Sequence, residues 1–376
     1  MREVKLNNWY RYFAITLPVV LLAGCAAPTE DAGRSLPFQG YEGQSINVII
    51  NYTSKGNTSL QAKSILRHLK RHIPGKPRFD LDYVSGNGGL NGANFLGQTN
   101  RRNGLRMGIF TIPVLSQVLK APELQVDFRD FEIIGAIGEQ TISHIRADAI
   151  PGKRIRNYRD ILFTKHAIRT GGHGYLSSKD LRIRLFFDTL KLPHRHVAIY
   201  QSSARIRAAI LRNELDLTSD TLLSYRGRVV PQLINTGISV PLWHVGHMTL
   251  DGELKCSESV PEEIPCFVKV YEEKFGKGKR PAKLHWDAIR TVAGSREILR
   301  VMVFPKGTPQ KAVDIMRAAW VKTMMDPAYL KEYNRMNRSP LVAMKGADAQ
   351  RYLRELLTVS PELQNFLLKY AAAGKE

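Results

Sequence analysis

Short apolar runs that alternate with amphipathic segments constrain this chain more than any other feature. Residues 45–50 are apolar and rich in β-branched side chains, which predicts a buried strand. A polar turn over residues 51–58 follows, and then Leu60, Ile65 and Leu69 recur at helical spacing. Because strands that alternate with helices form sheets covered by helices, the sequence predicts an α/β fold.

The same alternation continues to the end of the chain. Further predicted strands cover residues 79–84, 106–111, 167–170, 196–200, 215–218 and 300–304. Further predicted helices cover residues 158–163, 178–190, 203–212, 349–358 and 361–373, and one more begins at Thr308 and Pro309. The pattern indicates two α/β units, each with a mostly parallel sheet flanked by helices, and a chain end that returns to the first unit.

The start of the chain has the order of an export signal. Arg2, Lys5 and Arg11 precede an apolar run over residues 13–22, which is too short to span a bilayer comfortably. The run closes with Leu-Ala-Gly-Cys, and this ending resembles that of a bacterial lipoprotein signal.

This ending predicts a lipid-anchored protein of the bacterial periplasm. We expect residues 1–24 to be removed as a signal peptide and Cys25 to carry acyl chains that hold the protein on a membrane. Residues 25–43, rich in Ala, Pro and Gly, are expected to form a flexible tether. An ordinary secretory signal and a true anchor helix are the alternatives.

The chain is strongly basic. It contains 55 Lys and Arg residues against 34 Asp and Glu, for a formal net charge of +21. Such a balance favours anionic partners, namely nucleic acid, lipid headgroups or acidic solutes. The basic residues are scattered, and the sequence has neither zinc-finger spacing nor an aromatic-rich basic motif, so a nucleic-acid partner is not expected.

Two cysteines remain besides Cys25. Cys256 and Cys266 lie close together in sequence, and an exported protein meets an oxidising compartment, so we predict a disulfide between them. A redox-active pair is disfavoured because the sequence has no Cys-x-x-Cys spacing.

Several turns share an order and spacing with one family. Gly56 lies in the turn after the first strand, residues 84–89 form a glycine-rich turn, residues 171–175 form another, and residues 303–309 read Val-Phe-Pro-Lys-Gly-Thr-Pro. Together they resemble the solute-binding receptors of tripartite tricarboxylate transporters. The first loop departs from the family pattern, because Lys55 replaces a glycine and Ser59 replaces an acidic residue.

The resemblance covers about residues 45–370 and implies a two-lobed fold like that of type II periplasmic binding proteins. It places residues 44–140 and 248–376 in the first lobe, residues 141–247 in the second, and a hinge near residues 138–145 and 241–247. It implies a receptor rather than an enzyme. Such a receptor captures a small organic anion, most simply a carboxylate, uses no cofactor, and delivers the anion to a membrane permease.

Two loops have the composition of an anion site. Backbone N–H groups in the first turn of a helix lack intrahelical partners, and the helix dipole adds positive charge there. A carboxylate can therefore bind at a helix start, and glycine lets the backbone approach it. The expected ligand-binding residues, from one loop in each lobe and one nearby tyrosine, are Tyr52, Thr53, Ser54, Lys55, Gly56, Asn57, Thr58, Ser59, Gly171, Gly172, His173, Gly174, Tyr175 and Tyr200. A bulky residue at Gly56 or Gly172 is expected to weaken binding without unfolding the protein. The alternative is that each loop is an ordinary glycine-rich turn between a strand and a helix and binds nothing.

An enzyme and an interaction protein of a membrane complex are the two alternatives to the receptor. An enzyme is disfavoured, because the sequence contains no Gly-x-Ser-x-Gly motif and no Walker-type loop. His244 and His247 have a His-x-x-His spacing but no accompanying carboxylate motif, so no metal site is expected there. A lipid-anchored interaction or accessory protein of a membrane complex is the stronger alternative, supported by the positive charge, the altered first loop and the long insertion over residues 248–286.

Overall fold

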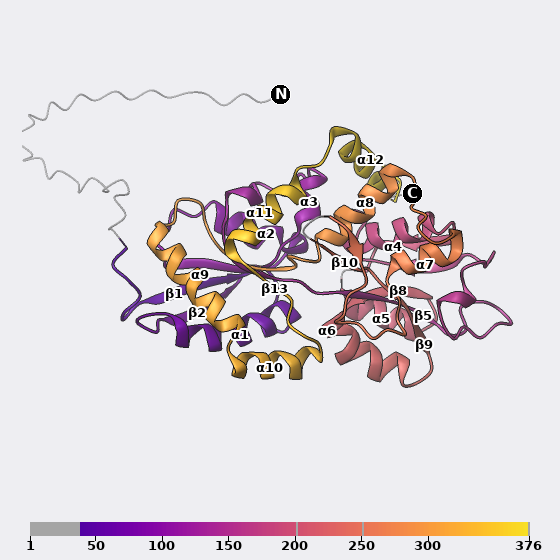
Figure 1. The fold of residues 1–376 in the computed structure, drawn as a ribbon, viewed down its shortest axis with the longest axis horizontal. Coiled ribbons are helices and arrows are strands. Elements are labelled where there is room, and N and C mark those ends of the chain that lie inside the picture. Colours follow the sequence, from indigo (N-terminus) through magenta and orange to yellow (C-terminus); the bar gives the residue numbers. More distant parts are fainter. Residues whose placement is uncertain (1–37, 201, 250–251, 375–376) are drawn as a thin grey trace, which may run out of the picture. The chain divides into compact units, whose positions relative to one another are not determined.

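Two β-sheets flanked by helices organise the chain (Figure 1). The computed structural model describes residues 38–200, 202–249 and 252–374. The predicted signal peptide, Cys25 and most of the predicted tether lie outside these described residues. Within them, no helix is both long enough and apolar enough to cross a bilayer.

The first sheet has the strand order β13-β4-β12-β3-β1-β2. Its strands are β1 (Ser45–Ile50), β2 (Arg78–Tyr83), β3 (Arg106–Thr111), β4 (Glu132–Ile137), β12 (Arg300–Phe304) and β13 (Ala343–Lys345). Its helices are α1 (Asn57–Leu69), α2 (Leu90–Gly97), α3 (Val114–Val118), α9 (Gln310–Met324), α10 (Pro327–Asn337) and α11 (Gly346–Leu357). Single helical turns lie at η1 (Lys70–His72), η2 (Asn87–Gly89) and η3 (Phe128–Asp130).

Strand β1 is apolar on both faces because helices cover both faces of this sheet. Ile49 packs in the core on the side of α2 and α11, whereas Val48 and Ile50 pack on the side of α1 and α9. A strand buried on both faces has a continuous apolar sequence rather than an alternating one. The run that predicted this strand therefore also reflects a central position in a covered sheet.

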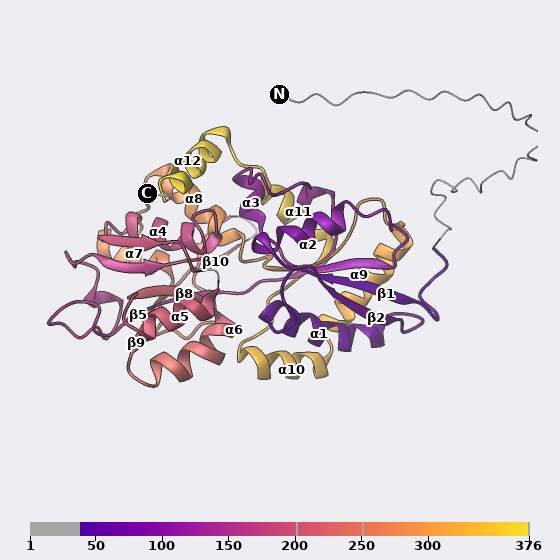
Figure 2. The same ribbon diagram turned by 180° about the vertical axis from the view of Figure 1, so that it is seen from behind.

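The second sheet has the strand order β7-β6-β8-β5-β9. Its strands are β5 (Thr141–Arg146), β6 (Ile168–Gly171), β7 (His194–Val197), β8 (Leu217–Thr221) and β9 (Ser239–His244), and a separate small ribbon pairs β10 (His247–Met248) with β11 (Leu254–Lys255). The remaining helical segments are η4 (Tyr158–Asp160), α4 (Ser178–Thr189), α5 (Ser203–Leu211), α6 (Leu222–Ser224), the π-helix η5 (Tyr225–Ile234), α7 (Phe267–Phe275), α8 (Lys283–Gly294) and α12 (Pro361–Ala372). Figure 2 shows α4 and α8 on the opposite side of this sheet from α5. Buried residues of α4, α7 and α8 belong to the same core cluster as Ile49, and buried residues of α5 and η5 form a separate one.

The α/β class, the two flanked sheets and the mostly parallel strands confirm the predicted fold class. In the first sheet β1, β2, β3 and β4 run in one direction, and β12 and β13 run in the other. In the second sheet β6, β7, β8 and β9 run in one direction, and β5 runs antiparallel to both of its neighbours. The strands β5 and β12 each come directly after a passage of the chain from one sheet to the other.

Part of the segment 248–376, which we predicted to belong to the first lobe, packs against the second sheet instead. Phe267 of α7 stacks on Phe186 of α4 with ring centroids 3.9 Å apart. Helix α8 packs against α4, and Tyr370 of α12 contacts Arg184 of α4. Helical periodicity identifies such helices but does not say which sheet they cover.

Two predicted elements also differ in extent. The predicted helix over 158–163 is a single turn at Tyr158–Asp160, and the predicted strand over 196–200 is found at His194–Val197. Both stretches are short, and short apolar segments do not determine whether a helix or a strand forms.

The predicted disulfide is present. Cys256 and Cys266 are bonded, with their Cα atoms 5.0 Å apart, and the bond joins the end of the β10–β11 ribbon to the start of α7. It therefore fixes the insertion to the second lobe through α7.

Replacing both cysteines by alanine is expected to lower the free energy of unfolding. The bond closes a loop with a sequence separation of 10 residues, for which chain entropy gives a loss of about 2–3 kcal/mol. Denaturant unfolding of the oxidised wild type and of the variant measures this difference. Equal unfolding midpoints for the wild type and the variant would contradict this, because they would show that the disulfide does not restrict the unfolded chain.

Candidate functional site

Two segments connect the sheets. Residues 138–140 lead from β4 to β5, and residues 295–299 lead from α8 to β12. The two segments are joined where the Glu139 N–H donates to the Arg296 carbonyl at 3.0 Å. The first segment begins in the predicted hinge range 138–145. The predicted range 241–247 does not contain the second, because the chain stays with the second lobe through α7 and α8.

The first predicted loop faces the second lobe at one residue. Asn57 Nδ2, at the start of α1, donates to Ser224 Oγ of α6 at 2.8 Å, so the two lobes touch here. Tyr52 donates through its hydroxyl to the Gly88 carbonyl at 2.8 Å, whereas Thr53, Ser54 and Lys55 are exposed. The exposed position of Lys55 gives it no contact with the interior of the cleft.

The start of α1 is connected to a buried cation. Gly56 precedes α1, and no side chain caps this helix start. Thr58 and Thr111 share a hydrogen bond of 2.7 Å, and Arg300 Nη1 donates to Thr111 Oγ1 at 2.6 Å. Ser59 is turned away toward the Tyr83 hydroxyl, 3.3 Å distant.

The second predicted loop binds a carboxylate of its own chain. The N–H groups of His173 and Gly174 donate to Asp180 Oδ2 at 2.8 and 3.2 Å, and Ser177 also donates to this oxygen. His196 Nε2 lies 2.7 Å from the other carboxylate oxygen. The donors that we expected to receive a solute are therefore occupied by Asp180.

The environment of Asp180 keeps it charged. Burial by itself raises the pKa of this carboxyl, but the hydrogen bond from His196 lowers it, and the net shift is downward. The adjacent His173 imidazole is neutral, since burial and the nearby Lys179 ammonium lower its pKa to about 3. Asp180 thus gives two donors of this loop a charged acceptor within the protein.

The two predicted tyrosines of the second lobe differ in surroundings. Tyr200 packs against the core under α5 and donates its backbone N–H to the Gly172 carbonyl at 3.2 Å. Tyr175 is half-buried in the loop before α4.

Three buried arginines between the lobes form the most unusual feature of the structure, and the sequence analysis did not single them out. The exposed fractions of Arg182, Arg296 and Arg300 are 2%, 5% and 4%. We call this set the arginine cluster. Arg182 comes from α4 of the second lobe, and Arg296 lies in the segment 295–299 that leads into β12. Arg300 is the first residue of β12.

The arginine cluster is only partly compensated. Arg300 Nη2 lies 4.0 Å from Glu139 Oε2, and Arg182 donates to Ser219 Oγ at 3.0 Å and to the Ser178 carbonyl. Within the part of the chain that the structure describes, no ion pair joins Arg182 or Arg296 to a carboxylate. Several guanidinium nitrogens in this cluster are buried without a hydrogen-bond partner, namely Nε of all three arginines and Nη2 of Arg296.

Burial and mutual repulsion both lower the pKa values of Arg182 and Arg296. Burial and the Arg296 charge lower the pKa of Arg182 to about 9, and the Asp180 and Asp220 carboxylates oppose this shift. Burial and the Arg300 charge lower the pKa of Arg296 to about 10, and the Glu139 and Glu297 carboxylates oppose this shift. The arrangement thus concentrates positive charge where water is excluded, which is costly without a counter-ion.

A small polar cavity lies beside the crossings. Its volume is about 20 Å³, enough for about one water molecule. Glu139, His247 and Glu297 are among the residues that line it. This cavity is too small for a solute of several carbon atoms.

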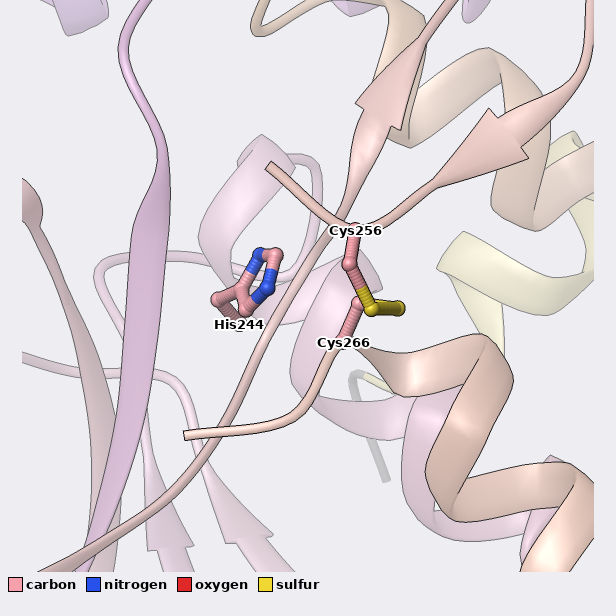
Figure 3. A group of neighbouring side chains, drawn as sticks. All are labelled: His244, Cys256 and Cys266. Carbon is pink, nitrogen blue, oxygen red and sulfur yellow. A yellow bond between two sulfur atoms is a disulfide. The ribbon is translucent and has the colours of Figure 1, made fainter. Parts of the chain in front are cut away.

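His244 and the disulfide form a group with the residue types of a metal site (Figure 3). The nearest possible ligand atoms of His244, Cys256 and Cys266 lie within 4.8 Å of one another. The two sulfur atoms are bonded to each other, so neither is the thiolate that a metal requires. His247 contacts Glu297 at 2.7 Å instead, so the two histidines of the His-x-x-His spacing have different partners.

The contact between Gly172 and Asp180 predicts the effect of substitution at two glycines of this loop. A Cβ atom at Gly172 would lie 2.0 Å from Asp180 Oδ1, whereas one at Gly174 would have nothing within 4 Å. Gly172→Ala is therefore expected to destabilise the protein by roughly 2 kcal/mol or more, because it displaces a buried carboxylate from its donors. Gly174→Ala is the matched control.

Thermal and denaturant unfolding of both variants tests this. Equal stability of the two variants would contradict the assigned role of Asp180. The earlier expectation that a bulky residue at Gly172 leaves the fold intact is not compatible with this contact.

Solved structures match the fold of this chain, whereas no family model and no curated protein sequence matches it. The periplasmic binding protein BugD is 15% identical, with 88% of this chain and 98% of that chain covered and a TM-score of 0.60. A TctC solute-binding protein from Polaromonas is 15% identical, with 89% and 99% covered and a TM-score of 0.59. A protein of R. palustris solved with adipate is 16% identical, with 88% and 97% covered and a TM-score of 0.61. The chain therefore has the two-lobed fold of periplasmic solute-binding proteins, which confirms the fold that the sequence resemblance implied.

Proposed function

We propose that this protein is a solute-binding receptor of the periplasm that captures a small organic anion, most simply a carboxylate. The observation that carries the proposal is the arginine cluster, in which Arg182 and Arg296 are buried without a carboxylate partner among the described residues. A buried unpaired charge is unfavourable, and an anion bound between the lobes removes that penalty.

The parts of the cleft have complementary roles in this proposal. The uncapped start of α1 and the Thr58–Thr111–Arg300 chain present hydrogen-bond donors from the first lobe. Arg182, held by Ser219, presents a guanidinium from the second lobe. A guanidinium matches a carboxylate in charge and in planar geometry, so it can bind both oxygens.

An anion bound to donors of both lobes would favour closure of the lobes. The solute enters when the lobes are apart and binds more tightly to the closed form, because only closure brings both sets of donors to it. A ligand shifts such an equilibrium by its difference in affinity for the two forms. The two crossings at residues 138–140 and 295–299 are the places where the backbone would bend.

Three further observations support this function. A protein of the same fold was solved with adipate, a dicarboxylate. The neighbours described above are binding or solute-binding proteins by description rather than enzymes. The start of the sequence supports export and lipidation at Cys25.

The anchor sets where the receptor would work. We propose that the acyl chains on Cys25 hold the receptor at a membrane and that the closed form delivers the anion to a permease there. The positive net charge would add attraction to anionic lipid headgroups.

A thermal-shift screen of the chain from residue 26 onward, without the lipid, against mono-, di- and tricarboxylates tests the proposed function. A ligand at about one hundred times its dissociation constant stabilises the fold by about 2.7 kcal/mol. We expect a selective rise in melting temperature, retained in Lys55→Gln because Lys55 is exposed. A flat response to all anions from a folded protein would contradict the receptor and favour the interaction protein of a membrane complex.

A further inference from the structure

His244 and the disulfide place one imidazole and two sulfur atoms close together (Figure 3). We propose that reduction of the Cys256–Cys266 bond by a small dithiol converts these three residues into a site for one Zn²⁺ ion. The site is separate from the arginine cluster, and it does not depend on the proposed function.

The ligand types and their spacing match zinc. The possible ligand atoms of the three residues lie within 4.8 Å of one another. Zinc binds thiolates at about 2.3 Å and imidazole at about 2.0 Å. In a tetrahedral shell these bond lengths place neighbouring ligand atoms about 3.5–3.8 Å apart. Once the S–S bond is broken, the two sulfur atoms therefore need to separate by less than about 2 Å.

The backbone holds two of the three ligands in place without the disulfide. His244 and Cys266 form a parallel β-bridge, and the His244 N–H donates to the Pro265 carbonyl at 2.9 Å. The exposed fractions of His244 and Cys266 are 2% and 1%. Reduction removes none of these contacts, so the two ligands would stay adjacent.

The third ligand follows a ribbon that is also held independently of the disulfide. Cys256 is half-buried and comes directly after β11. The opposite strand, β10, is fixed by Glu297, which contacts His247 Nδ1 at 2.7 Å and accepts the Met248 N–H at 3.1 Å. Breaking the S–S bond therefore frees the Cys256 side chain to turn while its backbone remains near His244.

The His244 imidazole has one nitrogen available for a metal. Its Nδ1 accepts the Gly246 N–H at 3.2 Å and lies 3.4 Å from Gln140 Oε1. Among the described residues no hydrogen bond to His244 Nε2 is found. When Nε2 binds the metal, the ring proton lies on Nδ1, and the bond from Gly246 is exchanged for one to Gln140 Oε1. Such a second partner is typical of metal-binding histidines.

A fourth ligand can come from water. The small polar cavity beside the crossings is lined by Gln140 and by Ser257, the residue after Cys256, among others. Its volume of about 20 Å³ admits about one water molecule. Zinc sites with three protein ligands commonly hold water in the fourth position.

The conversion balances in electrons, protons and charge. The dithiol gives two electrons and two protons to the Cys256–Cys266 bond, which breaks to form two thiols, and the dithiol becomes a disulfide. Zn²⁺ then replaces the thiol protons, which pass to water, and binds the neutral imidazole. Two thiolates balance the charge of the ion, so the complex avoids the cost of an uncompensated buried cation. In the reduced protein the metal would fasten the insertion to α7, as the disulfide does in the oxidised protein.

Zinc titration of the reduced and the oxidised protein tests this proposal. The chain from residue 26 onward contains all the described residues and lacks the Cys25 thiol. It is reduced with dithiothreitol, separated from the reductant without oxygen, and titrated with Zn²⁺ at pH 7.5. We expect one ion per reduced chain and a zinc-dependent rise in its melting temperature, with neither effect in the oxidised protein. X-ray absorption of the bound zinc should show two sulfur ligands and one imidazole.

Variants separate this site from surface binding. His244→Ala is expected to weaken zinc binding at least about 10-fold, the effect of losing even an outer partner of a metal ligand. Replacing both cysteines by serine is expected to abolish zinc binding. His166→Gln is the matched control, because His166 is an exposed histidine of the same lobe.

Several results would overturn the proposal. Reduced wild type that binds no stoichiometric zinc would do so, as would equal zinc binding by the reduced and oxidised forms. Unchanged affinity in His244→Ala would remove the imidazole from the site. If that variant does not fold, the ligand count from X-ray absorption of the wild type decides, and a shell without two sulfur atoms and one imidazole contradicts the site.

Discussion

Buried positive charge at the junction of the two lobes is the constraint on which the proposed function depends. Arg182, Arg296 and Arg300 are buried there, and among the described residues only Arg300 has an ion pair, with Glu139 at 4.0 Å. Guanidiniums remain protonated even when burial lowers their pKa, so the imbalance cannot be relieved by loss of a proton. The proposed anion would supply the missing negative charge.

The second loop holds an anion of its own chain. Two of its N–H groups bind Asp180, and Gly172 is required because the carboxylate lies against it. In the proposed function the solute is therefore bound in the second lobe by the Arg182 side chain, which lies one helical turn beyond Lys179 on α4.

Local patterns predicted the parts of the fold that local physics determines. The strand over 45–50 and the helix over 178–189 have sequences whose apolar residues match one structure only, and the close spacing of Cys256 and Cys266 identified their bond. Strand direction and the packing of α7, α8 and α12 on the second lobe depend on contacts between distant residues, and no local pattern encodes them. The arginine cluster was missed for the same reason. Each arginine is one of many basic residues in the sequence, and only the folded chain shows that three of them converge and that only Arg300 has an ion pair among the described residues.

The most direct measurement is a crystal structure of the protein with a bound carboxylate. The account predicts a carboxylate of the ligand within hydrogen-bond distance of a guanidinium of the arginine cluster, with Asp180 still bound to the His173 and Gly174 N–H groups. A ligand held by the second loop in place of Asp180, with the cluster arginines turned to carboxylates of the protein, would contradict it.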